Sequence, residues 1–84
     1  MKVCEIVWLD AWVTSTDYSI KKAQKCEPVK TSTIGYLVSE NEHGVTLAAD
    51  IYDKDKKNVK IVNFIPHGMI EEMWIYEDPE SKNG

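Results

Sequence analysis

The chain has 84 residues, of which 43% are hydrophobic and 29% charged, and its formal net charge is −4 at pH 7. This length allows one domain, and the composition is typical of a folded protein, which excludes extensive disorder. All basic residues are lysines. Arginine is the residue that grips phosphate or guanine in two places, so its absence, together with the negative charge, disfavours nucleic acid as a partner.

A chain of this size often gains stability from disulfides, metals or oligomerisation. Its two cysteines, Cys4 and Cys26, lie far apart in the sequence. The apolar run near the start is too short for a secretory segment, and no stretch approaches membrane-spanning length. We therefore expect a cytoplasmic protein with reduced thiols and no membrane contact, and a Cys4–Cys26 disulfide is the less favoured alternative.

The first predicted strand covers residues 3–9, which are apolar and partly β-branched. A long polar stretch follows at 14–33. Within it, residues 19–25 suit one or two helical turns, with Ser19 as the cap and Pro28 as the residue that stops the helix.

Four further strands are predicted, at 32–39, 45–52, 59–65 and 70–76. The turn after the third strand is acidic, with Asp53 and Asp55 close to Asp50, but it lacks the remaining ligands of a calcium loop. We interpret it as a solvated hairpin. Residues 1–77 are expected to form the single domain and residues 78–84 a flexible tail.

Five short strands, tight turns and one long early loop predict an all-β fold, namely a small five-stranded barrel. The segments are too short for a parallel sheet, which needs crossover helices. A closed barrel also leaves no unpaired strand edge.

Ile65-Pro66-His67-Gly68-Met69-Ile70 resembles the tight helical turn before the last strand of SH3-like barrels. Four blocks also resemble, in the same order, a group of small phage-encoded proteins: Trp8-Leu9-Asp10-Ala11, Ile34-Gly35-Tyr36-Leu37-Val38, Val45-Thr46-Leu47-Ala48 and the segment 65–70. The resemblance implies an SH3/Sm-like barrel and a viral accessory protein made in the cytoplasm of a bacterial host. It implies no activity and carries over no functional residues, and the chain lacks a peptide-binding SH3 signature.

No catalytic or metal site is predicted. A nucleophile–base pair would need Cys4 or Cys26 beside His43 or His67, and nothing in the spacing brings them together. Both histidines lie in predicted turns, which we interpret as surface positions. Structural zinc sites show ligand pairs two to four residues apart, which these four residues do not form. We therefore expect a protein that is not an enzyme and has no cofactor.

The candidate ligand-binding residues are Trp8, Asp10, Trp12 and Tyr18. Asp10 lies between the two tryptophans. It either caps the following turn through backbone N–H groups, which we favour, or points into a ligand pocket.

The candidate interface residues are Phe64, Trp74 and Tyr76. On the last strand, Met73 and Ile75 alternate with Trp74 and Tyr76. If the first pair faces the core, the second pair faces outward, where Trp and Tyr are typical interface anchors or stacking platforms. The opposite register would bury Trp74.

The favoured function is a phage anti-defence or host-takeover factor. Sm-like barrels form rings by pairing the fourth and fifth strands of neighbouring subunits, and the resulting interfaces would sequester a nucleotide-type immune signal. Lysines and backbone amides would meet the phosphate, and Tyr or Trp would stack on the base. Two alternatives remain, an acidic inhibitor that binds a host protein directly and an Sm-like RNA-binding ring, which the lack of arginine makes third.

Overall fold

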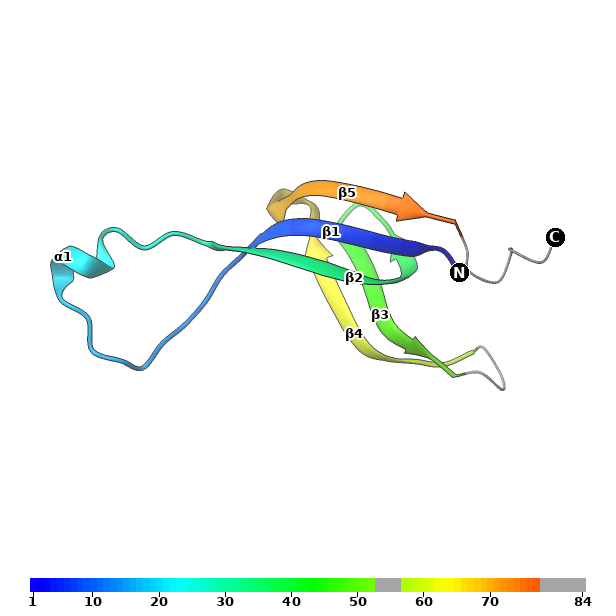
Figure 1. Cartoon of the computed structure of the whole chain (residues 1–84), viewed down its shortest axis with the longest axis horizontal. Coiled ribbons are helices and arrows are strands. Elements are labelled where there is room, and N and C mark those ends of the chain that lie inside the picture. The colour runs from blue at the N-terminus through cyan, green and yellow to red at the C-terminus, as the bar shows by residue number, and fades with distance from the viewer. Residues whose placement is uncertain (53–56, 78–84) are drawn as a thin grey trace.

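In a computed structural model of the chain, the residues described are 1–52 and 57–77. They form five strands and two short helical turns (Figure 1). In chain order these are β1 (Val3–Asp10), α1 (Ile20–Ala23), β2 (Val29–Glu40), β3 (Gly44–Ile51), β4 (Val59–Pro66), η1 (His67–Met69) and β5 (Ile70–Tyr76). The predicted all-β class and the five strands are confirmed. The predicted tail, and Asp53 and Asp55 of the acidic turn, lie outside the described residues.

The strands form one antiparallel sheet in the order β4-β3-β2-β1-β5. β4 pairs only with β3, and β5 pairs only with β1, so the sheet is open at both ends. The prediction of a closed barrel is therefore wrong for the single chain. The helices within the described ranges are all too short to cross a membrane.

A small core lies on one face of the sheet. Side chains alternate between the two faces of a strand, which places Cys4 and Ile6 of β1 on the same side. The fully buried cluster consists of Cys4, Ile6, Val45, Leu47 and Ile65. Partly buried side chains pack around it, namely Trp8, Leu37, Ile70 and Met73. We call the opposite side of the sheet the outer face.

Two glycines allow strands to approach each other closely. A Cβ atom on Gly35 would lie 2.8 Å from the carbonyl oxygen of Ala48, because β3 passes directly over this point of β2. A Cβ atom on Gly44 would overlap the carbonyl oxygen of Ile65. Any larger residue at either position would force the backbones apart.

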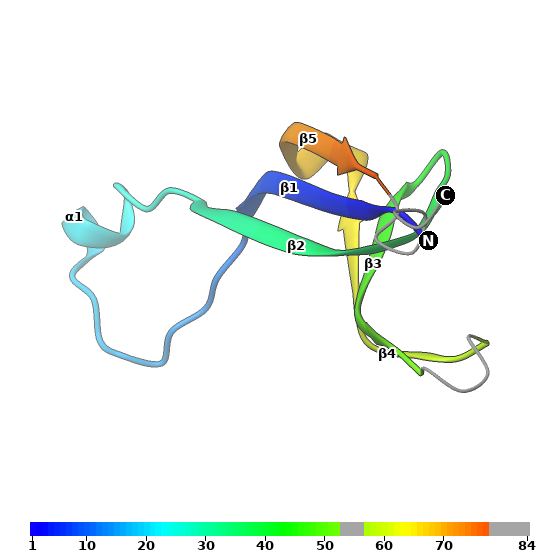
Figure 2. The ribbon, with the colours of Figure 1, turned by 45° about the vertical axis from the view of Figure 1, so that its right-hand side comes forward.

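The β3–β4 hairpin bends away from the rest of the sheet (Figure 2). The strand pairing of the hairpin is interrupted at Ala49 and Ile61. Ile61 has a φ of 57°, in the left-handed region that a β-branched residue rarely adopts. Burial therefore alternates along β3 only at its start. Beyond Leu47, Ala48 is buried and Ala49 is exposed.

Residues 11–28, which connect β1 to β2, project away from the sheet (Figure 1). We call this segment the arm, and every one of its residues is exposed. It contains α1, and the hydroxyl of Ser19 accepts a hydrogen bond from the backbone N–H of Lys22 at 3.1 Å, so the predicted cap is confirmed. The chain has a radius of gyration of 16.6 Å, whereas a compact domain of this length has about 12 Å.

Candidate binding surfaces

Three side chains form a cluster of their own on the arm, namely Trp12, Tyr18 and Lys22. The two rings lie 6.3 Å apart between centroids and are tilted by 48°. The ammonium of Lys22 lies 4.4 Å from the centroid of Tyr18, a cation–π contact. The indole N–H of Trp12 donates to the carbonyl of Glu27 at 2.7 Å, which joins the outgoing and returning halves of the arm. We call these three residues the arm cluster.

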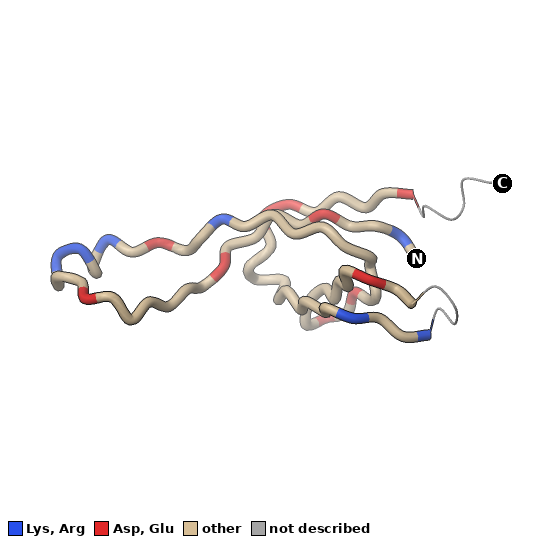
Figure 3. Tube along the Cα trace, turned by 60° about the horizontal axis from the view of Figure 1, so that its bottom comes forward, with Lys and Arg blue, Asp and Glu red and all other residues tan. Residues whose placement is uncertain are grey.

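The surroundings of the arm cluster are basic and partly hollowed. The arm carries Lys21, Lys22 and Lys25 against Asp17 and Glu27, and Figure 3 shows its far end as mostly basic. An open hollow beside Trp12 is lined by Ala11, Trp12, Cys26, Glu27 and Pro28. Aromatic faces beside ammonium groups suit a ligand that combines a planar ring with a phosphate.

The structure brings together only two of the four predicted ligand-binding residues. Trp12 and Tyr18 belong to the arm cluster. Trp8 packs against the core, and its indole N–H donates to the hydroxyl of Thr33 at 2.9 Å. Asp10 is half-buried at the end of β1, where it pairs with Val29, and the described part of the chain shows no hydrogen bond to its carboxylate. The capping role favoured for Asp10 is therefore not seen.

The outer face carries an apolar row that crosses all five strands. The pairing register aligns Tyr76, Val3, Tyr36, Ala48 and Val62, one residue from each strand, and of these Ala48 is buried. The neighbouring row, on three strands, contains Trp74, Glu5 and Ile34. The sequence pattern did not predict these rows, because their alignment depends on the register of each strand pair.

The three predicted interface residues all lie on the side of the sheet opposite the core. Met73 packs against the core, so Trp74 and Tyr76 point the other way, and the alternative register that would bury Trp74 is excluded. Trp74 and Tyr76 are 43% and 46% exposed. Phe64 of β4 pairs with Thr46 of β3 and follows Asn63 and precedes the buried Ile65 in its strand. Its side chain is also exposed. Their role in an interface stays a prediction.

A hydrogen-bonded chain crosses the outer face from β5 to β2. The hydroxyl of Tyr76 donates to one carboxylate oxygen of Glu5 at 2.9 Å, and the hydroxyl of Ser32 donates to the other at 3.3 Å. The bond to Glu5 raises the pKa of Tyr76 above its ordinary value, because it stabilises the protonated phenol.

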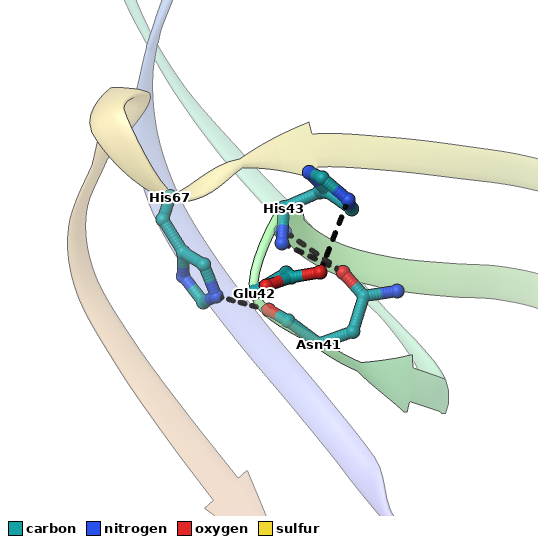
Figure 4. Close-up of polar contacts among 5 residues, drawn as sticks. Asn41, Glu42, His43 and His67 are labelled. Carbon is teal, nitrogen blue, oxygen red and sulfur yellow. Dashed lines mark hydrogen bonds and ion pairs between the residues drawn. The ribbon is translucent and has the colours of Figure 1, made fainter.

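The two histidines lie in adjoining turns, a proximity that the sequence spacing did not indicate (Figure 4). The imidazole of His67 donates from Nε2 to the carbonyl of Asn41 at 2.6 Å, and its backbone N–H donates to the carbonyl of His43 at 3.3 Å. The side-chain oxygen of Asn41 accepts from the N–H groups of His43 and Gly44. These contacts join the β2–β3 turn to η1, so we interpret the cluster as structural.

No catalytic or metal constellation occurs within the described ranges. Cys4 is buried in the core and Cys26 is exposed on the arm, whereas the histidines lie in the turns just described. Residues 1–52 and 57–77 contain no group of three or more potential ligands that could hold a metal ion.

Comparison with family models, with curated proteins and with solved structures gave no match.

Proposed function

We propose that the protein is a non-enzymatic binding module that works as a homo-oligomer, with its copies joined at the free edges of the sheet. The observation that carries this proposal is the open sheet, in which β4 and β5 each pair on one side only. The unpaired N–H and C=O groups of an edge strand are a template for a strand from another chain.

Both edge strands also expose large apolar side chains. On β4 these are Ile61, Val62 and Phe64, and on β5 they are Trp74, Ile75 and Tyr76.

Pairing of β4 with the β5 strand of a second copy is a head-to-tail contact. Such contacts close into a ring when the rotation between copies allows it. An SH3/Sm-like ring of this kind would complete in the assembly the closure that the single chain lacks.

The ligand that best fits the arm cluster is a nucleotide-type molecule. The rings of Trp12 and Tyr18 offer stacking surfaces, and the lysines of the arm offer charge for a phosphate. For a phage accessory protein, the corresponding role is to sequester a nucleotide immune signal in the bacterial cytoplasm. Direct binding to a basic host protein is the second candidate, because the free edge strand β5 carries the exposed carboxylates Glu71 and Glu72.

Native mass spectrometry tests the assembly. We expect a single multiple of the 9.6 kDa chain. Phe64→Lys, on the free strand β4, should reduce this mass, whereas Val38→Lys, an exposed apolar position on the central strand β2, should leave it unchanged. A strict monomer at all concentrations would overturn the proposal, and circular dichroism of both variants verifies that they fold.

Thermal unfolding with a panel of mono-, di- and cyclic nucleotides tests the ligand. We expect at least one to raise the melting temperature by selective binding to the folded chain. Tyr18→Ala should abolish the shift, whereas Tyr52→Ala, an exposed tyrosine outside the arm, should keep it. If no nucleotide shifts the transition, the nucleotide is the wrong ligand class, and recovery of a specific host protein in a pull-down would favour the second candidate.

A further inference from the structure

The arm leaves apolar side chains without cover. Val13 is 94% exposed and Ile20 is 79% exposed, and neither contributes to the arm cluster. Holding an ordered segment in place costs backbone entropy, which burial of apolar surface normally offsets. The arm buries no residue of its own.

The arm extends beyond the end of the sheet along the direction of β1 and β2, as both ribbon views show (Figures 1 and 2). It therefore points away from the edge strands and toward a copy placed beyond the end of its own sheet. The outer face offers such a copy an apolar surface around Ile34 and Trp74.

The charges of the two surfaces are complementary. Three lysines against Asp17 and Glu27 give the arm a net charge of +1, which leaves −5 for the rest of a chain whose total is −4.

The outer face of β5, β1 and β2 carries Glu5 and Glu72, and also Lys30 at the start of β2, since all three alternate with the core-facing residues of their strands. Glu5 already accepts hydrogen bonds from Tyr76 and Ser32, so of these two carboxylates Glu72 is the one free to meet a lysine. Lysines at the far end of the arm and the carboxylate of Glu72 therefore suit each other in a desolvated contact.

We propose that the arm of one copy lies across the outer face of β5, β1 and β2 of a second copy, so that two copies exchange arms. Val13 and Ile20 pack against apolar side chains such as Ile34, and the arm lysines meet Glu72. A mutual exchange uses the same two patches on both copies, which is the arrangement of a two-fold dimer. This inference rests on one part of the proposed function, namely that the chain self-associates. It places the arm cluster where two copies meet.

Two charge-matched variants test the arm contact. Val13→Lys with Ile20→Lys puts two ammonium groups at the proposed contact, and Ser15→Lys with Gln24→Lys adds the same charge elsewhere on the exposed arm. We expect the first variant to halve the native mass or to weaken association at least about tenfold, and the second to assemble as the wild type does. Assembly of the first variant with wild-type mass and affinity would overturn the inference.

Cross-linking locates the contact. Cys26 is exposed on the arm, and Ile34→Cys places a second thiol on the outer face. Within one chain, at least five residues of extended strand, about 17 Å, separate the two thiols. A short bifunctional maleimide should therefore link Cys26 only to Cys introduced in another copy, which mixing with ¹⁵N-labelled chain would show. Absence of mixed-isotope links would contradict the arm exchange.

The outcomes separate this inference from the proposed function. If Phe64→Lys reduces the assembly to a dimer that still forms the link between Cys26 and the thiol introduced by Ile34→Cys, both the edge contact and the arm contact exist. If Phe64→Lys reduces the native mass but the arm variant leaves it unchanged, the edge assembly stands and the arm exchange is wrong. A wild-type chain that is monomeric throughout overturns both.

Discussion

Gly44 and Gly68 differ in what surrounds their α-carbons. A Cβ atom on Gly44 would overlap the Ile65 carbonyl and lie 2.9 Å from the Cα of Pro66, whereas one on Gly68 would have nothing within 4 Å. We expect Gly44→Ala to lower the free energy of unfolding by about 1–3 kcal/mol, because the clash involves backbone atoms. Gly68→Ala should stay within about 0.5 kcal/mol of the wild type. Urea unfolding of both variants measures this, and equal effects would show that the close approach at Gly44 does not matter.

The two cysteines differ in burial, and we expect them to differ in reactivity. Burial raises the pKa of the Cys4 thiol, and the nearby Glu40 carboxylate adds to the effect, so the reactive thiolate is depleted and shielded. Cys26 is exposed. A colorimetric disulfide reagent at mildly alkaline pH should therefore modify Cys26 quickly and Cys4 only after denaturation. Cys26→Ser should abolish the fast phase, and a fast phase that survives in this variant would contradict the assignment.

At the scale of elements, the pairing of β5 with β1 includes the bond from Tyr76 to Glu5. The pKa of Tyr76 is higher in the folded chain than its ordinary value of 10.0. The bond therefore contributes its full stability below about pH 10, and the contribution is lost as the pH rises through the folded-state value. We expect the wild type to lose more stability than Tyr76→Phe as the pH rises above about 10. Chemical unfolding at several pH values checks this, and parallel curves for the two proteins would contradict it.

The β2–β3 turn and η1 show how elements far apart in sequence hold each other. His67 bonds to the carbonyl of Asn41, and Asn41 in turn orders the backbone of its own turn. Both turns were predicted from their Asn, Gly and Pro residues, since those residues favour turns locally. Their contact was not predicted, because it depends on where β3 and β4 end relative to each other.

At the scale of the whole molecule, the core is small for the surface that the chain exposes. Among the described residues, the fully buried core cluster has five members, and the arm adds none. If copies associate as proposed, folding and assembly are linked, and the melting temperature should rise with protein concentration. Calorimetry over a range of concentrations measures this, and Phe64→Lys should show a weaker dependence than Val38→Lys. A wild-type melting temperature independent of concentration would argue against linked assembly.

The positions of the strands were largely predictable. The last strand was predicted with its observed bounds, residues 70–76, and β1, β3 and β4 agree with the predictions to within one residue at each end. β2 begins at Val29, three residues before the predicted start, because residues 29–31 pair with the end of β1. That extension depends on a partner strand, so local propensity did not show it.

The sequence by itself determined the all-β class, the five strands, the capped helical turn at Ser19 and the alternation of Met73 and Ile75 with Trp74 and Tyr76, whose outward direction the structure decided. These depend on side-chain period and local hydrogen bonds, which act over a few residues. Only the tertiary structure decided that the sheet stays open, that the arm stands clear of it and that one apolar row crosses five strands. These depend on register between distant segments and on backbone bends such as the one at Ile61, and no local pattern encodes how such bends add up.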